Sequence, residues 1–307
     1  MKPDKNAVNW IAVDWGTSNL RAFAMDGRGD VLAEASSAAG MGSLRRDQFE
    51  AALLALIEPW LGEGVTPVFA CGMVGARQGW TEAAYHQVPC APLDGAHMTQ
   101  VLADDPRLSV RIIPGLCQMK PADVMRGEET QIAGYLAGNP GFDGVLCLPG
   151  THCKWVRISA GEVVSFQTFM TGEIFALLSG QSVLRHSLNE PGWDEAAFVA
   201  ALDETLSRPE KVAARLFSLR AEGLIEGLSP QAARARLSGI LIGAELAAAR
   251  PYWLGQAVVV IGAGTLAGHY ARALAAQGVV AATAPADGMT LAGLKAARAL
   301  GRNGHGA

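Results

Sequence analysis

The chain has 307 residues, of which half are hydrophobic and 18% are charged, and its formal net charge is −4. This length exceeds that of most single domains, so two domains are the expected organisation. A slightly acidic chain without a run of Lys or Arg is a poor match to nucleic acid or an anionic membrane, and neither is expected as a partner. The five cysteines show no CxxC spacing, which favours reduced thiols in a cytoplasmic protein.

The first part of the chain predicts three short strands followed by alternating helices and strands. Apolar runs bounded by Gly, Asp and Asn are typical of strands, and apolar residues at helical spacing predict a helix over 47–61. The strands are expected at 10–15, 20–25, 31–36, 66–71 and 109–113, and two further helices at 94–102 and 128–136. The predicted order is βββαβαβα.

The same order starts again at residue 144. Strands are expected at 144–148, 153–158, 163–169, 257–261 and 279–283, a helix-rich stretch at 172–250, and helices at 266–277 and 289–300. Two copies of one βββαβαβα plan predict an α/β protein with a helical insertion in its second copy. We expect two lobes, at residues 1–140 and 141–307, that face each other across a cleft.

The first glycine turn, DWGTSNLRA at 14–22, joins a buried strand that ends in Asp14 to the next strand. Gly16 allows a close approach of the backbone, and Thr17 and Ser18 add hydroxyl donors, so the turn can bind phosphate oxygens. Asp14 would then hold Mg²⁺ beside those phosphates, normally through water. A β-hairpin with an Asp at its entry is an equally good interpretation of this segment taken alone.

The second glycine turn, LPGTHCKWV at 148–156, occupies the same place in the second copy. Gly150 and Thr151 alone are a weak signal, but two phosphate-type turns at equivalent places in two repeats predict that the lobes clamp one triphosphate. His152 and Cys153 are adjacent without a third ligand at metal-like spacing, so a zinc site is not expected there.

The third glycine turn, at 258–278, matches the dinucleotide fingerprint GxGxxA after an apolar strand and before a helix. A dinucleotide site also needs an acidic residue about 20 positions later, and none follows before Asp287. An NAD-binding protein is therefore the less favoured interpretation. A turn that contacts a nucleoside fits the repeat better.

The segment VMRGEETQ at 124–131 lies between the repeats. Arg126 and Gly127 turn the chain, and Glu128 and Glu129 begin a helix, where carboxylates suit the positive helix end. Such acidic pairs are common without a catalytic role. Phosphoryl transfer to an alcohol needs a carboxylate near the hydroxyl, and one of these Glu residues can serve as the general base.

Together these motifs resemble the sugar-kinase branch of the actin, hexokinase and Hsc70 superfamily, which has two ribonuclease-H-like lobes. The chain is more specifically similar to the 2-dehydro-3-deoxygalactonokinase family, over residues 10–297. RGEETQ and PGTHCKWV are specific to that family, whereas the glycine turns are widely shared. The other matching blocks are IAVDWGTSNLRA, CGMVGARQGW, IIPGLC, FMTGE and LSGILIGAE.

The resemblance implies phosphorylation of 2-dehydro-3-deoxy-D-galactonate at its 6-hydroxyl in galactonate catabolism, with ATP and Mg²⁺ as cofactors. The small sugar acid and ATP are the expected partners, and a homodimer is one of the states that the sequence allows. The expected contacts are Gly16, Thr17, Ser18, Asn19, Gly150, Thr151 and His152 for the ATP phosphates, Gly262, Gly264 and Thr265 for adenosine, and Arg77, Arg126 and Lys154 for the substrate.

Related sugar kinases carry Gly-Asp where this chain has Gly127-Glu128, so the role of base is transferred by position. We expect Glu128 to be the base rather than Glu129, with Asp123 as the next residue to test. Two alternatives stay open: a kinase of another sugar or sugar acid on the same fold, and an actin-like ATPase that phosphorylates no sugar.

Overall fold

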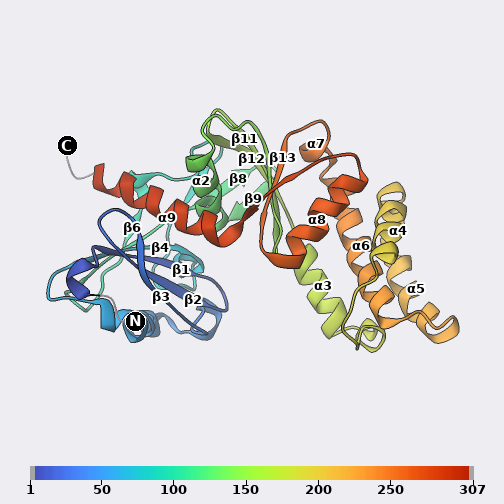
Figure 1. Ribbon diagram of the computed structural model, residues 1–307, viewed down its shortest axis with the longest axis horizontal. Helices are drawn as coiled ribbons and strands as arrows, with labels where there is room; N and C mark the ends of the chain where they lie inside the picture. Colours follow the sequence, from blue (N-terminus) through green and yellow to red (C-terminus); the bar gives the residue numbers. More distant parts are fainter. Residues whose placement is uncertain (1–3, 304–307) are drawn as a thin grey trace. The chain divides into compact units, whose positions relative to one another are not determined.

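The computed structural model describes residues 4–303, which form two compact units (Figure 1). The first unit contains residues 4–142, 159–165 and 286–303, and the second contains residues 143–158 and 166–285. The division into lobes at 1–140 and 141–307 remains a prediction. The compact units divide the chain differently, because 159–165 and helix α9 (Ala286–Asn303) belong to the first unit. The ends of the predicted lobes, 1–3 and 304–307, lie outside the described residues.

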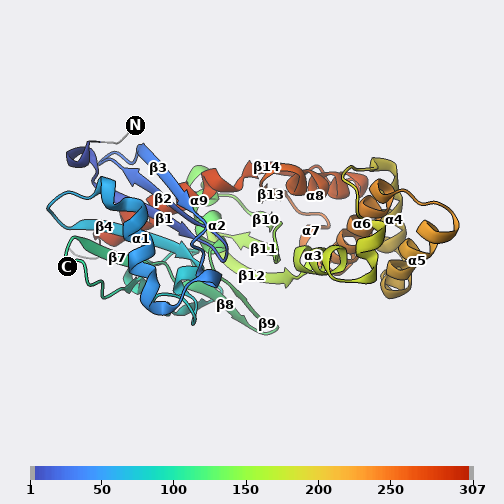
Figure 2. The same cartoon turned by 90° about the horizontal axis from the view of Figure 1, so that it is seen from below.

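The main sheet of the first unit has six strands in the order β3-β2-β1-β4-β7-β6 (Figure 2). Strands β1, β2 and β3 form an antiparallel meander, and β4 and β7 continue the sheet in parallel beside β1. The bounds are β1 Trp10–Trp15, β2 Leu20–Met25, β3 Val31–Ser37, β4 Thr66–Gly72, β6 Thr99–Gln100 and β7 Leu108–Ile112.

Helices cover both faces of this sheet, which explains why β1 is apolar at nearly every position. On one face, Ile11, Val13 and Trp15 pack in a core with helix α1 (Phe49–Ile57). On the other face, Trp10 and Ala12 pack with helices α2 (Glu128–Gly138) and α9 (Ala286–Asn303).

Helices α2 and α9 approach each other closely through glycines. A Cβ atom on Gly134 would lie 1.9 Å from the carbonyl oxygen of Met289, and one on Gly293 would lie 1.9 Å from that of Thr130. No side chain fits at either position. This contact ties the C-terminal helix to the first unit.

The sheet of the second unit has the strand order β12-β11-β10-β13-β14, which repeats β3-β2-β1-β4-β7 of the first sheet. Strand β10 pairs antiparallel with β11 and parallel with β13, as β1 pairs with β2 and β4. The predicted duplication is therefore confirmed. The bounds are β10 Gly144–Leu148, β11 Cys153–Ser159, β12 Glu162–Phe169, β13 Val258–Gly262 and β14 Ala282–Pro285.

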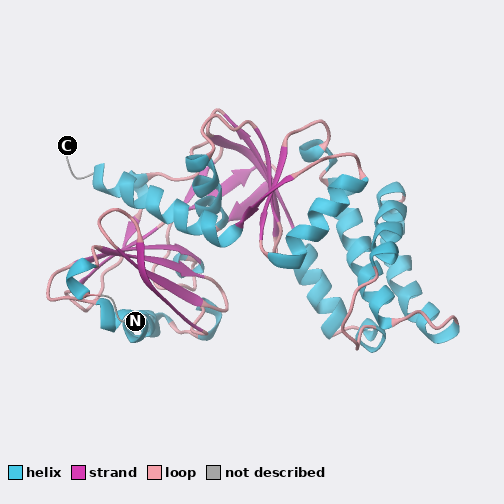
Figure 3. Cartoon of the chain, in the orientation of Figure 1, coloured by secondary structure: helices cyan, strands magenta, loops and turns pink. Residues whose placement is uncertain are grey.

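The predicted helical insertion lies between β12 and β13 (Figure 3). Its long helix α6 packs against α4 and α5, and buried side chains such as Leu219, Leu237 and Leu241 form a separate core there. The helices of the second unit are α3 Thr171–Gly180, α4 Glu195–Ser207, α5 Val212–Ile225, α6 Pro230–Ala248, α7 Arg250–Trp253 and α8 Gly264–Ala276.

The structure corrects the predicted elements at three places. The helix expected at 94–102 is wrong: a single 3₁₀ turn, η6 (Gly95–His97), and the two-residue strand β6 stand there. A second sheet of the first unit, β5-β8-β9, was not predicted, with bounds β5 Tyr85–Gln87, β8 Gly115–Met119 and β9 Ala122–Met125. The strand expected at 279–283 begins only at Ala282.

Short 3₁₀ turns complete the chain, at Lys5–Ala7, Met41–Ser43, Arg46–Gln48, Glu58–Trp60, Met73–Gly75, Val183–Ser187 and Pro209–Lys211. Within residues 4–303, no helix is both long enough and apolar enough to span a membrane.

Candidate active site

The first glycine turn is a four-residue hairpin between β1 and β2. The Gly16 N–H donates to the Asn19 carbonyl at 2.9 Å, and the side chains of Thr17, Ser18 and Asn19 are exposed. The segment after β3 supports the turn from behind, because a Cβ on Gly40 would lie 2.2 Å from the carbonyl carbon of Ser18. The hairpin interpretation is thus correct for the backbone, and the exposed hydroxyls keep the turn available for a ligand.

Asp14 lies at the end of β1, directly before this turn, and its side chain is 22% exposed. Its Oδ2 accepts a hydrogen bond from Arg21 Nη2 at 2.6 Å, and Arg21 Nη1 donates to Asp287 Oδ1 at 2.6 Å. One arginine therefore holds two carboxylates together. The ion pair between Arg21 and Asp287 was not predicted from the sequence, where Asp287 was considered only as the first acidic residue after the third glycine turn.

The predicted helix start at Gly127 lies beside the end of β4. Gly127 has φ 106°, a value that favours glycine, and a Cβ there would lie 3.3 Å from Gly72 Cα. Asp14 of β1 pairs with Cys71 of β4, so the ends of the two strands and the start of α2 meet. The Cys71 thiol lies 4.0 Å from Asp14 Oδ1.

The two glutamates at the helix start have different surroundings. Glu129 is fully buried; its Oε2 accepts from the Gly127 N–H at 2.6 Å, and its Oε1 accepts from the Thr130 hydroxyl at 3.0 Å. Burial, together with the nearby Glu128 carboxylate, raises the pKa of Glu129 to about 8. Glu128 is only half-buried, and its Oε2 accepts from the Arg126 N–H at 3.0 Å.

The three side chains expected to bind substrate differ in exposure and in their contacts. Arg77 is exposed in the first unit. The Arg126 guanidinium, also in the first unit, donates from Nη2 to the Ala83 carbonyl at 2.7 Å and stacks 4.2 Å from the centre of the Tyr85 ring. Lys154 is buried in the second unit, where its Nζ donates to Thr168 Oγ1 at 2.8 Å.

The second glycine turn borders a cavity of about 690 Å³ that lies wholly within the second unit. A cavity of this size is within the range of small-molecule sites. Gly150 and Thr151 line it, as do Thr171 and Gly172 at the start of α3 and Thr265 at the start of α8. The structure thereby brings together one residue of the predicted adenosine motif and two of the second phosphate motif.

The starts of α3 and α8 both have free donor capacity. Neither helix has a side-chain hydrogen bond at its N-cap, although in α3 the Glu173 N–H donates to the Thr151 carbonyl at 3.0 Å. The other first-turn N–H groups lie at the positive ends of two helix dipoles and can donate to a ligand. The turn and α3 are in close contact, because a Cβ on Gly172 would lie 2.2 Å from the Gly150 carbonyl oxygen. Such helix starts favour anions.

Three of the predicted ATP contacts lie beside the cavity rather than in its wall. His152 pairs with α3, since its Nε2 lies 2.6 Å from Glu173 Oε2. Gly262 ends β13 against Ala267, and Gly264 begins α8 with φ 56°. None of the three is among the cavity-lining residues, although His152 and Gly264 each adjoin one in sequence.

The apolar wall of the cavity was not predicted from the sequence. The Trp193 ring stacks on His269 with their centres 3.9 Å apart and their planes 21° apart. The Trp193 Nε1 donates to Glu195 Oε2 at 2.8 Å, and Arg272 Nη1 donates to the same oxygen at 2.7 Å. Trp193 and His269 are far apart in sequence, and no local pattern marks them as neighbours.

A buried carboxyl, Glu245 of α6, forms hydrogen bonds with two cavity-lining residues, Thr171 and Tyr270. It accepts hydrogen bonds from Trp155 Nε1 at 2.7 Å, from the Tyr270 hydroxyl at 2.7 Å, and from the Thr171 hydroxyl. Burial raises the pKa of Glu245. This network connects the start of α3, at Thr171, and the middle of α8, at Tyr270, to strand β11, at Trp155.

Comparison with known proteins identifies the family. The family model described as 2-keto-3-deoxy-galactonokinase matches residues 14–297. The chain belongs to this family. It is 40% identical over 294 residues to a protein of Rhizobium meliloti (strain 1021) named probable 2-dehydro-3-deoxygalactonokinase, with 94% of this chain and 96% of the relative covered. It is 36% identical over 292 residues to the 2-dehydro-3-deoxygalactonokinase of Escherichia coli (strain K12), with 94% and 97% covered.

Solved structures agree. A crystal structure of a Sinorhizobium meliloti protein that carries the same enzyme name is 39% identical, has a TM-score of 0.87 and matches 95% of this chain and 99% of its own. The Clostridium difficile activator of 2-hydroxyisocaproyl-CoA dehydratase, with bound ADPNP, is 11% identical with a TM-score of 0.51 over 96% of each chain, and it shares the fold. Membership of the family makes the chain a sugar kinase, a phosphotransferase with an alcohol group as acceptor, and confirms the resemblance.

Proposed function

We propose that the chain transfers the γ-phosphoryl group of ATP to the 6-hydroxyl of 2-dehydro-3-deoxy-D-galactonate. The names of the relatives at 36–40% identity support this substrate. The observation that carries the use of ATP is the 690 Å³ cavity, which combines an aromatic wall with two uncapped helix starts. A cytoplasmic location and a role in galactonate breakdown stay predictions for this chain.

The cavity divides into a base-binding part and a phosphate-binding part. The Trp193 ring, which stacks on the buried His269, offers a flat surface on which an adenine ring can stack. Gly150, Thr151 and the start of α3 offer N–H and hydroxyl donors for phosphate oxygens. Thr265 lies at the start of α8, where it can reach the ribose.

Mg²⁺ is the expected metal, and the residues present suit it. Asp14 is partly exposed at the end of β1 and supplies the carboxylate oxygens that Mg²⁺ prefers, with water completing its coordination. When bound, the ion neutralises the charge that builds up on the transferred phosphoryl group. The exposed hydroxyls of Thr17 and Ser18 follow Asp14 closely in the chain and can hold the phosphates beside it.

The general base in this proposal is Glu128. A base must be able to accept a proton at neutral pH, and Glu129, with a pKa of about 8, is mostly protonated there. Glu129 instead fixes the backbone at Gly127, so that it positions the helix start that presents Glu128. Glu128 is half-buried, unlike the fully buried Glu129.

Arg77 and Arg126 remain the proposed contacts for the carboxylate of the sugar acid. Guanidinium groups suit this role because they donate two parallel hydrogen bonds. Arg126 is the better supported, because its Nε and Nη1 are buried without a hydrogen-bond partner in the part of the chain that the structure describes. A substrate carboxylate that reached these two nitrogens would accept their hydrogen bonds.

A coupled assay of ADP release tests the substrate. The enzyme is mixed with ATP, Mg²⁺ and each of a set of aldonic and 2-keto-3-deoxy sugar acids, and the position of the new phosphate is assigned by NMR. We expect the highest kcat/KM with 2-dehydro-3-deoxy-D-galactonate and phosphate at C6. A higher kcat/KM with another sugar acid would identify a different substrate, and ATP turnover unaffected by every sugar acid would contradict the kinase assignment.

A further inference from the structure

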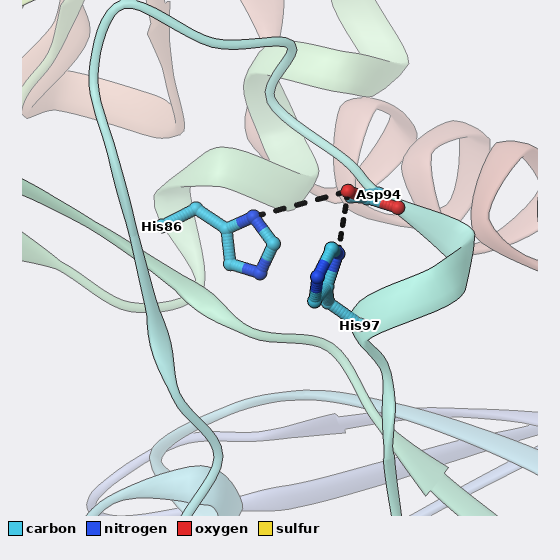
Figure 4. Close-up of side chains that lie close together, drawn as sticks. All are labelled: His86, Asp94 and His97. Carbon is cyan, nitrogen blue, oxygen red and sulfur yellow. Dashed lines mark hydrogen bonds and ion pairs between the residues drawn. The ribbon is translucent and has the colours of Figure 1, made fainter.

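Two imidazoles and a carboxylate that play no part in the proposed active site converge at one place in the first unit (Figure 4). His86 is the middle residue of β5, Asp94 caps the 3₁₀ turn η6, and His97 is the last residue of that turn. One donor atom from each lies within 4.8 Å of the other two.

The distances at this cluster suit a metal ion. His97 Nδ1 lies 2.7 Å from Asp94 Oδ2, and His86 Nδ1 lies 4.0 Å from the same oxygen. Metal–ligand bonds of about 2.0–2.2 Å place the donors of a tetrahedral site about 3.4 Å apart. The two observed distances lie on either side of this value, so small side-chain rotations would give all three donors a common centre.

The protein holds the carboxylate in the required orientation. Asp94 Oδ1 accepts a hydrogen bond from the Ala96 N–H at 2.9 Å, so that Oδ2 is directed at the two imidazoles. A hydrogen bond to the other oxygen of a ligating carboxylate is the usual way in which a protein orients a metal ligand.

The imidazoles are available as ligands. Within residues 4–303, the ring of His86 makes no hydrogen bond, and the Asp94 carboxylate lies 4.0 Å from its Nδ1. The two rings meet edge to face, with centres 4.5 Å apart and planes 76° apart. Neutral imidazole is the commonest side-chain ligand of metal ions in proteins.

We propose that His86, Asp94 and His97 bind a divalent transition-metal ion, with Zn²⁺ as the best match. Two nitrogen donors and one oxygen donor suit Zn²⁺, Co²⁺ or Ni²⁺, and they do not suit Mg²⁺, which prefers oxygen donors only. The site is therefore chemically distinct from the Mg²⁺ site proposed at Asp14. Water would complete the coordination, because His97 and Asp94 are partly exposed.

Binding would connect β5 and η6, which lie at the two ends of one loop. The chain between β5 and η6 forms no regular strand or helix, and η6 rests on α9, where a Cβ on Gly95 would lie 2.9 Å from Leu300 atoms. An ion held by His86 and His97 would close this loop, and closing a loop stabilises the folded state against the unfolded chain.

Calorimetric titration of Zn²⁺ into the metal-free, full-length protein at pH 7.5 tests the site. We expect one ion per chain, and His97→Ala, in which an exposed side chain is removed, should lower the affinity at least about tenfold. His86→Ala/His97→Ala should lose the site, whereas the control His186→Ala, at an exposed position of the second unit, should bind as the wild type does. Circular dichroism of each variant verifies the fold.

Co²⁺ gives a second and independent measurement. The visible absorption spectrum of the Co²⁺ protein should show that the bound ion has a low coordination number. This absorption should disappear when the pH is lowered through the range in which imidazole is protonated, because a proton and the ion compete for the same nitrogen. Equal Zn²⁺ affinity in the wild type and the double variant, or a Co²⁺ spectrum unchanged by the double substitution, would show that the cluster is only a hydrogen-bonded cap.

Discussion

Replacing Glu129 by Gln should change how the stability of the protein depends on pH. The pKa of Glu129 is raised from 4.5 to about 8, so between these values the folded state keeps a proton that the unfolded state releases. The folded state binds more protons in this window, and the free energy of unfolding therefore falls as the pH rises. The difference of about 3.5 pH units corresponds to about 5 kcal/mol lost by pH 9.

The Glu129→Gln variant removes this titration and keeps most of the local contacts. The new amide oxygen can still accept from the Gly127 N–H, and only the bond from the Thr130 hydroxyl must reverse its direction, at a cost of about 1 kcal/mol. At pH 5 the variant should be slightly less stable than the wild type. At pH 9 it should be more stable by a few kcal/mol.

Urea denaturation at a series of pH values from 5 to 9 measures the difference. The wild type should lose up to about 1.4 kcal/mol per pH unit relative to Glu129→Gln within the window. Glu63→Gln, which changes an exposed glutamate of the first unit, serves as the control and should follow the wild type. Parallel curves for the wild type and Glu129→Gln would refute the raised pKa, and with it the argument that Glu129 is protonated at neutral pH.

Four further outcomes follow from the active-site geometry. Glu128→Gln should lower kcat at least about 100-fold with KM for ATP nearly unchanged, and a nearly normal kcat would move the role of base to another carboxylate. Asp14→Ala should lower turnover by orders of magnitude at ordinary Mg²⁺ while circular dichroism stays that of the wild type, and normal turnover would contradict the metal assignment. Arg77→Ala or Arg126→Ala should raise KM for the sugar acid, and two unchanged KM values would exclude both residues as carboxylate contacts. Trp193→Ala should raise KM for ATP about tenfold with kcat largely kept, because base stacking contributes about 1–3 kcal/mol, and an unchanged KM would place adenine elsewhere.

Much of the fold could be predicted because the signals were local. Short turns between apolar runs indicated both three-strand meanders, and the repetition of one order of elements indicated the duplication. The prediction of a helix at 94–102 failed because the chain makes only one 3₁₀ turn after its cap, Asp94, and then pairs with β7 as strand β6. The sheet β5-β8-β9 has strands of three to five residues, which are too short for a period of two to be recognised.

The candidate site was predictable only where its residues follow one another in sequence. The glycine turns and the RGEET segment lie at the expected strand ends and helix start. Trp193, His269 and Glu245 could not be found in this way, because each contributes through neighbours on other elements. The sequence contains one local indication of this part of the site. Trp193 follows Pro191 and Gly192 in a loop before a helix, and a Trp in such a loop is a candidate for contact with a ligand.

The neighbouring residues Glu128 and Glu129 show most clearly what the sequence leaves undecided. They carry the same functional group, but successive residues of a helix point about 100° apart, so one enters the core and the other does not. Which of the two is buried depends on the backbone conformation of Gly127 and on its close contact with Gly72, and thus on how α2 packs beside β4. Burial also decides the protonation state, because it raises the pKa of Glu129 to about 8. The protonated Glu129 side chain accepts the hydrogen bond of the Gly127 N–H. The choice between two glutamates at one helix start therefore depends on which of them is desolvated, and only the structure around them shows this.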